Sequence, residues 1–472
     1  MVFSSLEFLF GFLPITLLLY FLVPPRYLKW RNAVLFVVSL VFYGWGEPVY
    51  VFLMVFTIAV NYICGWLLDR CLAKGDRPGA KRWMIISVVV SLGILAFFKY
   101  YNFFADNLRL IPVFAGIPQI DVSLPIGISF YTFQSMSYTL DLYMGNAKVQ
   151  TNFVSFGTYV TLFPQLIAGP IVRYKDIDDM LRSRDENLAL FASGVRTFTA
   201  GLCKKILFAN MAGQLWENFK AAPDAERTVL GAWMGIIFYT FQIYFDFSGY
   251  SDMAIGLGKM FGFKFLENFN YPYIAQNITD FWRRWHMSLS TWFREYVYIP
   301  LGGSHCSKLK TYRNLLVVWF LTGFWHGASW NYILWGLFYF VLLVAEKAFL
   351  RKWLEKIPVF FRHVYTMFFV ILGWLLFVSE DLSLGVKILG AMFGGASGFA
   401  SQGDIYDLLR LIPFIAILII ACTPYPKKLF YRLYEKKTWW RAVTAVGCSL
   451  VMVLCVSYLV DSSFNPFLYF RF

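Results

Sequence analysis

Residues 279–303 read TDFWRRWHMSLSTWFREYVYIPLGG, a stretch that combines several charges with a dense run of aromatic residues. The apolar side chains recur at the i, i+4, i+8, i+11, i+12 and i+15 spacing of one helical face. They are Phe281, Trp285, Leu289, Trp292, Phe293 and Tyr296. Arg283, Arg284 and Arg294 lie off this face, and His286 lies at its edge. The spacing therefore predicts one amphipathic helix over 279–298.

The ends of this helix are marked by local signals. Thr279 or Asp280 can cap its start, and Pro300 followed by two glycines ends it. The segment carries too many charges to span a bilayer as an isolated helix. We expect it to lie at the membrane interface or to re-enter the membrane under a cover of protein.

A short segment with polar residues, GFWHGASWN, occupies 323–331 within the apolar run 314–350. An imidazole in such a run is costly unless it has a partner or faces a hydrated cavity, so His326 is a candidate functional residue. The alternative is a packing histidine that is hydrogen-bonded to nearby backbone. The sequence leaves both interpretations open.

The composition indicates a membrane protein. Of the 472 residues, 59% are hydrophobic, 21% are aromatic and only 15% are charged. The net charge of +14 comes from basic residues clustered in short connections between apolar runs, and no nucleic-acid-binding motif is present. The prediction is a polytopic, all-α protein of the plasma membrane with about 11–12 transmembrane helices. Membrane lipids are its expected surroundings.

The candidate spans are runs of about 20 apolar residues, some of them short or interrupted. They are 6–23, 33–45, 49–68, 84–104, 124–144, 153–172, 189–213, 229–247, 314–346, 363–379, 405–424 and 442–460. Basic clusters at 26–31, 69–83, 347–356 and 425–441 are expected to face the cytoplasm. Their alternation with non-basic connections predicts that both termini are extracytoplasmic.

The middle of the chain, 124–345, differs from the flanking parts because its apolar runs carry many polar residues, Gly and Pro. A lipid-facing helix would not tolerate this density of polar groups. We expect one domain over 1–472, in which 124–345 lines a central funnel and 1–123 and 346–472 supply peripheral helices. Asp246, in the segment DFSGYSD, is either a polar lining residue or part of a helix cap.

Several other chemistries lack a sequence signal. The seven cysteines show no CxxC pair or metal-ligand spacing, so neither a disulfide framework nor a metal site is predicted. There is no GxSxG, P-loop or GxGxxG motif.

The motifs WRRWHMSLSTWFREYVYIPLGG and WHGASWNYILWG resemble the membrane-bound O-acyltransferase family, and within it the membrane subunits of alginate-type polysaccharide O-acetyltransferases. The similarity extends through LPIGISFYTFQSMSY, LFPQLIAGPIVRY and YFDFSGYSDMAIGLG, so it covers nearly the whole chain. The resemblance implies that His326 is the essential histidine and that His286 is the second polar position. Arg294, Ser288, Asn331, Asp246 and Trp325 are weaker candidates for supporting roles.

The resemblance also implies a function. The expected enzyme moves an acyl group, most simply acetyl from acetyl-CoA, out of the cytoplasm to a hydroxyl of a partner protein or polysaccharide. No bound cofactor is expected. An extracytoplasmic SGNH-type, esterase-like partner would complete the transfer to the polysaccharide acceptor. Two alternatives stay open: D-alanyl transfer to teichoic acid from a carrier-protein thioester, and a non-enzymatic transporter or flippase, although the internal repeats typical of transporters are not evident.

Overall fold

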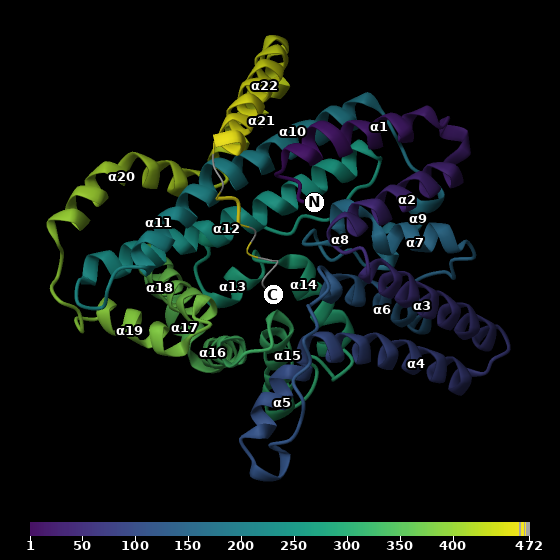
Figure 1. Ribbon diagram of the computed structural model, residues 1–472, viewed down its shortest axis with the longest axis horizontal. Helices are drawn as coiled ribbons and strands as arrows, with labels where there is room; N and C mark the ends of the chain where they lie inside the picture. The colour runs from purple at the N-terminus through teal and green to yellow at the C-terminus, as the bar shows by residue number, and fades with distance from the viewer. Residues whose placement is uncertain (462–463, 467, 469–472) are drawn as a thin grey trace. The chain divides into compact units, whose positions relative to one another are not determined.

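The computed structural model describes residues 1–461, 464–466 and 468. This part of the chain is built from helices and contains no β-strand, which confirms the all-α prediction (Figure 1). Contacts divide the chain into two compact units, Met1–Phe198 with Tyr250–Leu266, and Thr199–Gly249 with Glu267–Phe472. Each unit is described by itself. The single domain with a funnel lined by 124–345 stays a prediction.

Ten helices lie wholly or mostly in the described part of the first unit. They are α1 (Leu13–Leu22), α2 (Leu28–Gly46), α3 (Tyr50–Ala73), α4 (Arg77–Leu95), α5 (Tyr101–Arg109), α6 (Ile128–Met144), α7 (Phe153–Thr161), α8 (Phe163–Leu166), α9 (Tyr174–Arg182) and α10 (Leu188–Cys203).

The other twelve helices belong wholly or mostly to the described part of the second unit. They are α11 (Met211–Lys220), α12 (Val229–Met260), α13 (Ile278–Trp282), α14 (Met287–Phe293), α15 (Lys308–His326), α16 (Trp330–Ala345), α17 (Arg351–Leu354), α18 (Val359–Val378), α19 (Leu382–Met392), α20 (Gln402–Ala421), α21 (Tyr425–Lys436) and α22 (Thr438–Asp461).

Short π-helical segments extend or join several α-helices, a feature that is frequent at functional sites. They are η1 (Glu7–Phe12), η3 (Ala96–Tyr100), η5 (Lys204–Asn210), η7 (Arg294–Tyr298) and η8 (Glu346–Leu350).

In the first unit, α6 packs against both α3 and α4. Polar side chains join these helices: Ser87 donates to Asn61 over 2.6 Å and lies 2.9 Å from the hydroxyl of Thr139. Nearly every residue of α6 is buried, including Gln134 and Ser135. The polar residues of the predicted span 124–144 are therefore covered by protein.

By length and composition, six helices of the described residues can cross a membrane, or up to eight if each of two bent pairs is one span. This supports a multi-pass membrane protein, and the expected number of about a dozen spans is larger than this count. Part of the difference comes from the runs 6–23 and 33–45, which form a pair of helices bent by 103° and count as at most one span. The run 153–172 is broken into the short helices α7 and α8.

The candidate spans differ in how much protein covers them. In α12, 78% of the apolar window is buried inside the protein, compared with 11% in α22 and 28% in α18. The polar residues Gln242, Asp246 and Ser248 all lie in α12 and are all buried. They can therefore contribute to a site without facing lipid.

Candidate active site

His326 is the last residue of α15, and the close packing of α15 on α16 fixes its position. A Cβ atom at Gly323 would lie 2.3 Å from the carbonyl oxygen of Tyr332, and one at Gly336 would lie 2.3 Å from that of Trp319. Only glycine permits this approach of the two helices. The chain leaves α15 at Gly327 in an extended conformation and enters α16 at Trp330. The small residues of the segment 323–331 thus form the turn between α15 and α16 that positions His326.

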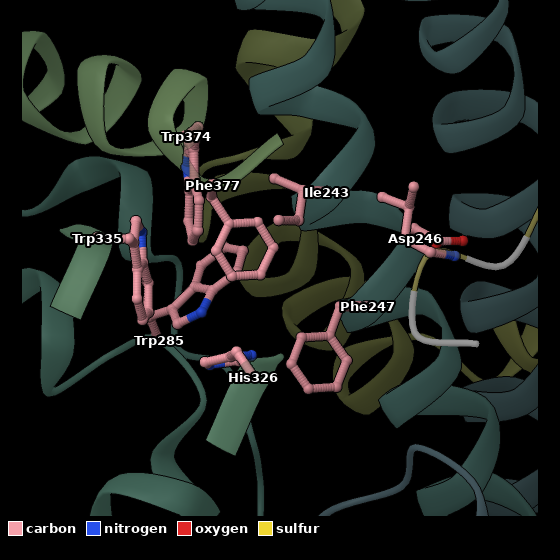
Figure 2. A pocket seen from close by; sticks show the side chains of 9 residues that line it. Ile243, Asp246, Phe247, Trp285, His326, Trp335, Trp374 and Phe377 are labelled. Atoms are coloured by element: carbon pink, nitrogen blue, oxygen red, sulfur yellow. The ribbon is translucent and has the colours of Figure 1, made fainter. Parts of the chain in front are cut away.

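Aromatic side chains surround the His326 ring. The centroids of Trp325 and Trp335 lie 5.1 Å from it, and that of Phe377 lies 5.2 Å away. Figure 2 shows the pocket that this histidine lines. The other lining residues are Ile243, Asp246, Phe247, Trp285, Trp374 and Leu468. The open space measures about 10 Å³, close to the lower limit for one water molecule.

The segment 279–298 is helical only in parts, and the prediction of one continuous helix is wrong. The structure has α13, a break at 283–286, α14 and then η7. His286 adopts the left-handed conformation with φ 44° and ψ 54°, which ends any continuous helix there. Neither Thr279 nor Asp280 caps the start, because the Asn277 side chain accepts from the backbone N–H of Asp280.

A buried carboxylate from η8 holds the start of α13. Glu346 is 2% exposed and accepts from the backbone N–H groups of Ile278 at 2.7 Å and Thr279 at 2.9 Å. A negative charge at this position compensates the free N–H groups at the beginning of the helix. The contact ties the segment that carries His286 to the helix that follows His326.

The break at His286 is stabilised by the upstream segment 268–270. The N–H of Met287 donates to the carbonyl oxygen of Asn268, and the N–H of Asn270 donates to that of Arg284, both over 2.9 Å. The Asn268 side-chain oxygen lies 3.1 Å from Nδ1 of His286. These bonds replace the helical ones that the break removes.

His286 is 1% exposed, and this burial lowers the pKa of its imidazole to about 3. The ring is therefore neutral at physiological pH. It contacts Phe247 edge-on at 4.7 Å and lies 6.2 Å from Trp325. Since Phe247 also lines the His326 pocket and Trp325 adjoins it, the two predicted catalytic histidines lie in one aromatic cluster.

Asp246 lies in the same pocket and is paired with a lysine that the sequence analysis missed. Lys205 Nζ is 2.6 Å from Asp246 Oδ1, and both side chains are 2% exposed. The backbone N–H of Leu468 donates to Asp246 Oδ2 over 3.0 Å, and Lys205 donates to the carbonyl oxygen of Pro466. The ion pair therefore holds part of the C-terminal segment at the pocket.

The predicted supporting residues have different positions. Ser288 lies 3.4 Å from His286 Nδ1 through its hydroxyl. Asn331 is buried and donates to the carbonyl oxygen of Phe377 over 2.9 Å, behind the pocket wall. Trp325 packs on His326, whereas Arg294 is exposed at the start of η7 and does not line the pocket. The catalytic roles of all these residues stay predictions.

Two important side chains were not predicted from the sequence. A signal existed for Lys205, because a lysine pair interrupts the apolar run 189–213 and a buried cation needs a carboxylate. Asn268, in the segment ENFNYPY, gave no signal, since asparagine near proline usually indicates a turn. Among the residues that the structure describes, no three His, Cys, Asp or Glu side chains gather as metal ligands.

The fold and the pocket define a multi-pass membrane protein with two buried histidines in an aromatic site. Comparison with known proteins narrows this class. Residues 144–386 match the model of MBOAT, the membrane-bound O-acyltransferase family. The chain therefore belongs to the membrane-bound O-acyltransferase family and is an O-acyltransferase.

Individual relatives agree with this assignment over most or all of the chain. The probable alginate O-acetylase AlgI of Azotobacter vinelandii is 39% identical over 507 aligned positions, covering 100% of both chains. That of Pseudomonas aeruginosa is 45% identical over 397 positions, covering 83% of this chain and 75% of its own. The peptidoglycan O-acetyltransferase of Helicobacter pylori is 32% identical over 523 positions, covering 100% and 98%.

Proposed function

We propose that this O-acyltransferase moves an acetyl group from a cytoplasmic thioester, with acetyl-CoA as donor, to a hydroxyl on the outer side of the membrane. The observation that carries the proposal is the narrow aromatic pocket at His326, with His286 in the same cluster. The names of the relatives support acetyl as the group and a polysaccharide as the final acceptor.

The chemistry requires a base, an oxyanion donor and exclusion of water. In the proposed step, His326 accepts the hydroxyl proton as the hydroxyl oxygen attacks the thioester carbon. The carbon–sulfur bond then breaks, and the thiolate leaves with the proton from the imidazolium. His286 contacts the acceptor hydroxyl. The aromatic walls keep bulk water from the thioester.

Trp335 is the best candidate for an oxyanion donor. Its side chain is 1% exposed and lines the pocket 5.1 Å from the His326 ring. Its indole N–H is buried and has no hydrogen-bond partner among the described residues. A buried donor without a partner is costly, and a negative oxygen that forms during the reaction would satisfy it.

The route beyond the membrane is part of the proposal. An extracytoplasmic SGNH-type partner would receive the acetyl group and pass it to the polysaccharide, and both termini of this chain would face outward. Basic clusters in alternate connections support that orientation. A C-terminal fusion to a reporter that is active only in the cytoplasm should be silent, and an active fusion would reject the orientation.

The activity is tested with purified protein in lipid vesicles and acetyl-CoA labelled in the acetyl group. We expect release of free CoA that requires His326 and increases when the acceptor system is added. D-alanyl-loaded carrier protein is the competing donor. Consumption of that thioester, with acetyl-CoA left intact, would replace acetylation by D-alanylation.

A further inference from the structure

Asn268 makes an unusual number of contacts around the break at His286. The side chain is 1% exposed, and its Oδ1 atom has three neighbours. The backbone N–H of Ser288 donates to it over 3.2 Å, the Ser288 hydroxyl donates over 2.9 Å, and Nδ1 of His286 lies 3.1 Å away. The Asn268 carbonyl oxygen binds the N–H of Met287 as well.

These contacts determine which ring nitrogen of His286 carries the proton. A backbone N–H can only donate, so the Asn268 atom facing Ser288 must be the amide oxygen and not the nitrogen. An oxygen can only accept from the imidazole, so Nδ1 must be the protonated nitrogen. In the neutral ring, Nε2 then carries the lone pair.

The backbone supports the same arrangement. His286 has φ 44°, and among the described residues only one other non-glycine residue, Tyr271, has a positive φ. Such a conformation costs on the order of 1–3 kcal/mol and persists only where the surroundings impose it. Here the hydrogen bonds that Asn268 accepts from the backbone N–H groups of the two residues after His286 impose it. Backbone and side chain of one asparagine thus fix both the place and the tautomer of the ring.

We propose that Asn268 is a positioning residue that holds His286 with Nδ1 protonated, so that Nε2 accepts a hydrogen bond from the acceptor molecule and does not donate to the oxyanion, while His326 takes the proton of the reacting hydroxyl. The inference rests on the proposed function and deepens it. It leaves oxyanion stabilisation to another donor, in agreement with the buried indole of Trp335.

Titratable groups near His286 lie next to the residues that contact its ring. The α12 residue that touches its ring, Phe247, follows Asp246, which is paired with Lys205 of η5. The α15 residue nearest to its ring, Trp325, precedes His326. A carboxylate introduced at position 268 would adjoin Nδ1 directly, so its effect on the imidazole would exceed that of these neighbours.

The test is the pH dependence of acetyl transfer by the full chain in vesicles, with Asn268→Asp and Asn268→Leu. Asn268→Asp keeps an acceptor for Nδ1 and adds a negative charge, which raises the pKa of His286. Because the base His326 must also be unprotonated, the raised pKa of His286 should make the acidic limb of kcat steeper and move it upward, with activity retained at alkaline pH. Asn268→Leu removes the acceptor and should lower kcat on the order of 10²-fold with little change in KM.

Asn314→Asp is the matched control for the added charge. Asn314 is also fully buried, but it lies twelve residues before His326, about 18 Å along α15. This variant should leave the acidic limb in place. If Asn268→Leu does not insert stably into the membrane, the pH dependence of kcat for Asn268→Asp alone tests the role of Asn268.

The outcomes separate this inference from the proposed function. An Asn268→Asp profile that superimposes on the wild type, or wild-type turnover of folded Asn268→Leu, would overturn the role of Asn268. Wild-type turnover of His286→Ala would instead remove His286 from the proposed reaction. An inactive His286→Ala together with a shifted Asn268→Asp profile supports both.

Discussion

Lys205 and Asp246 form a buried ion pair, with Nζ 2.6 Å from Oδ1 and only 2% of either side chain exposed. The pair joins η5 to α12 and binds main-chain groups of Pro466 and Leu468 at the same time. Leu468 lines the pocket of His326. Besides joining two helices, the ion pair thus supplies hydrogen bonds to main-chain groups of the C-terminal segment, which an apolar pair could not do.

Replacing one member of this pair should destabilise the protein strongly. Lys205→Met leaves the Asp246 carboxylate buried without a counter-ion, which typically costs roughly 3–5 kcal/mol. The double variant Lys205→Met/Asp246→Leu should recover much of this loss, because it removes the buried charge altogether. Thermal unfolding in detergent measures both effects.

The control for this prediction is an exposed pair in the same unit. Lys387 lies 2.8 Å from Asp224, with 58% and 55% of the side chains exposed. Lys387→Met should leave the unfolding temperature unchanged, since solvent screens exposed pairs. A Lys205→Met protein as stable as the wild type would contradict the assigned importance of burial.

Trp335→Phe tests the proposed oxyanion donor. The substitution keeps an aromatic ring in the pocket wall and removes the indole N–H. Loss of one such donor typically lowers kcat by about 10²–10³-fold, and we expect KM to change little. Trp319→Phe is the control, because Trp319 packs 6.3 Å from Trp335 but does not line the pocket. Equal kcat values for the two variants would remove Trp335 from this role.

The buried imidazole of His286 should make stability depend on pH. Its pKa is lowered by burial to about 3, whereas the unfolded chain regains the usual value near 6.5. Between these values the unfolded state binds more protons, so stability is lost as the pH falls from about 6.5 towards 3. The loss reaches at most about 1.4 kcal/mol per pH unit. His286→Gln should flatten this dependence in unfolding experiments; an unchanged slope would contradict it.

The sequence identified the two histidines that the structure brings into one cluster, but not the local backbone geometry around them. Both histidine motifs could be recognised because burying an imidazole among apolar residues is costly unless the group has a partner or a function. In the structure, His326 lines a pocket. The break at His286 could not be predicted. The aromatic stripe over 279–298 continues with helical spacing through the break, and no glycine or proline marks it. The cause is a tertiary contact with Asn268, which local patterns do not contain.

The same reasoning applies to the run 314–346. Its length and hydropathy predict one continuous span, but the chain turns back at Gly327–Ser329 and packs on itself through Gly323 and Gly336. Hydropathy does not report this close approach of two backbones. The polar residues of α12 were a better guide to its surroundings than its hydropathy, since Gln242 and Asp246 are buried within the protein.

His326→Ala should abolish acetyl transfer while the protein stays folded and inserted. Removing a general base typically costs about 10²–10⁴ in rate. The imidazole is 5% exposed and packs between Trp335 and Phe377, so its loss also leaves a small cavity. Turnover must therefore be normalised to folded protein, and His305→Ala, at an exposed loop position, provides the matched histidine control.

The comparison with His286→Ala distinguishes the two histidines. If His326 is the base and His286 contacts the acceptor hydroxyl, His326→Ala should stop both acetyl transfer and acetyl-CoA hydrolysis. His286→Ala should impair transfer more than hydrolysis, because water needs less positioning than a bulky acceptor. If His326 only packs between aromatic rings, His326→Ala would unfold at a lower temperature but retain wild-type turnover per folded molecule. That result would overturn the mechanism proposed here.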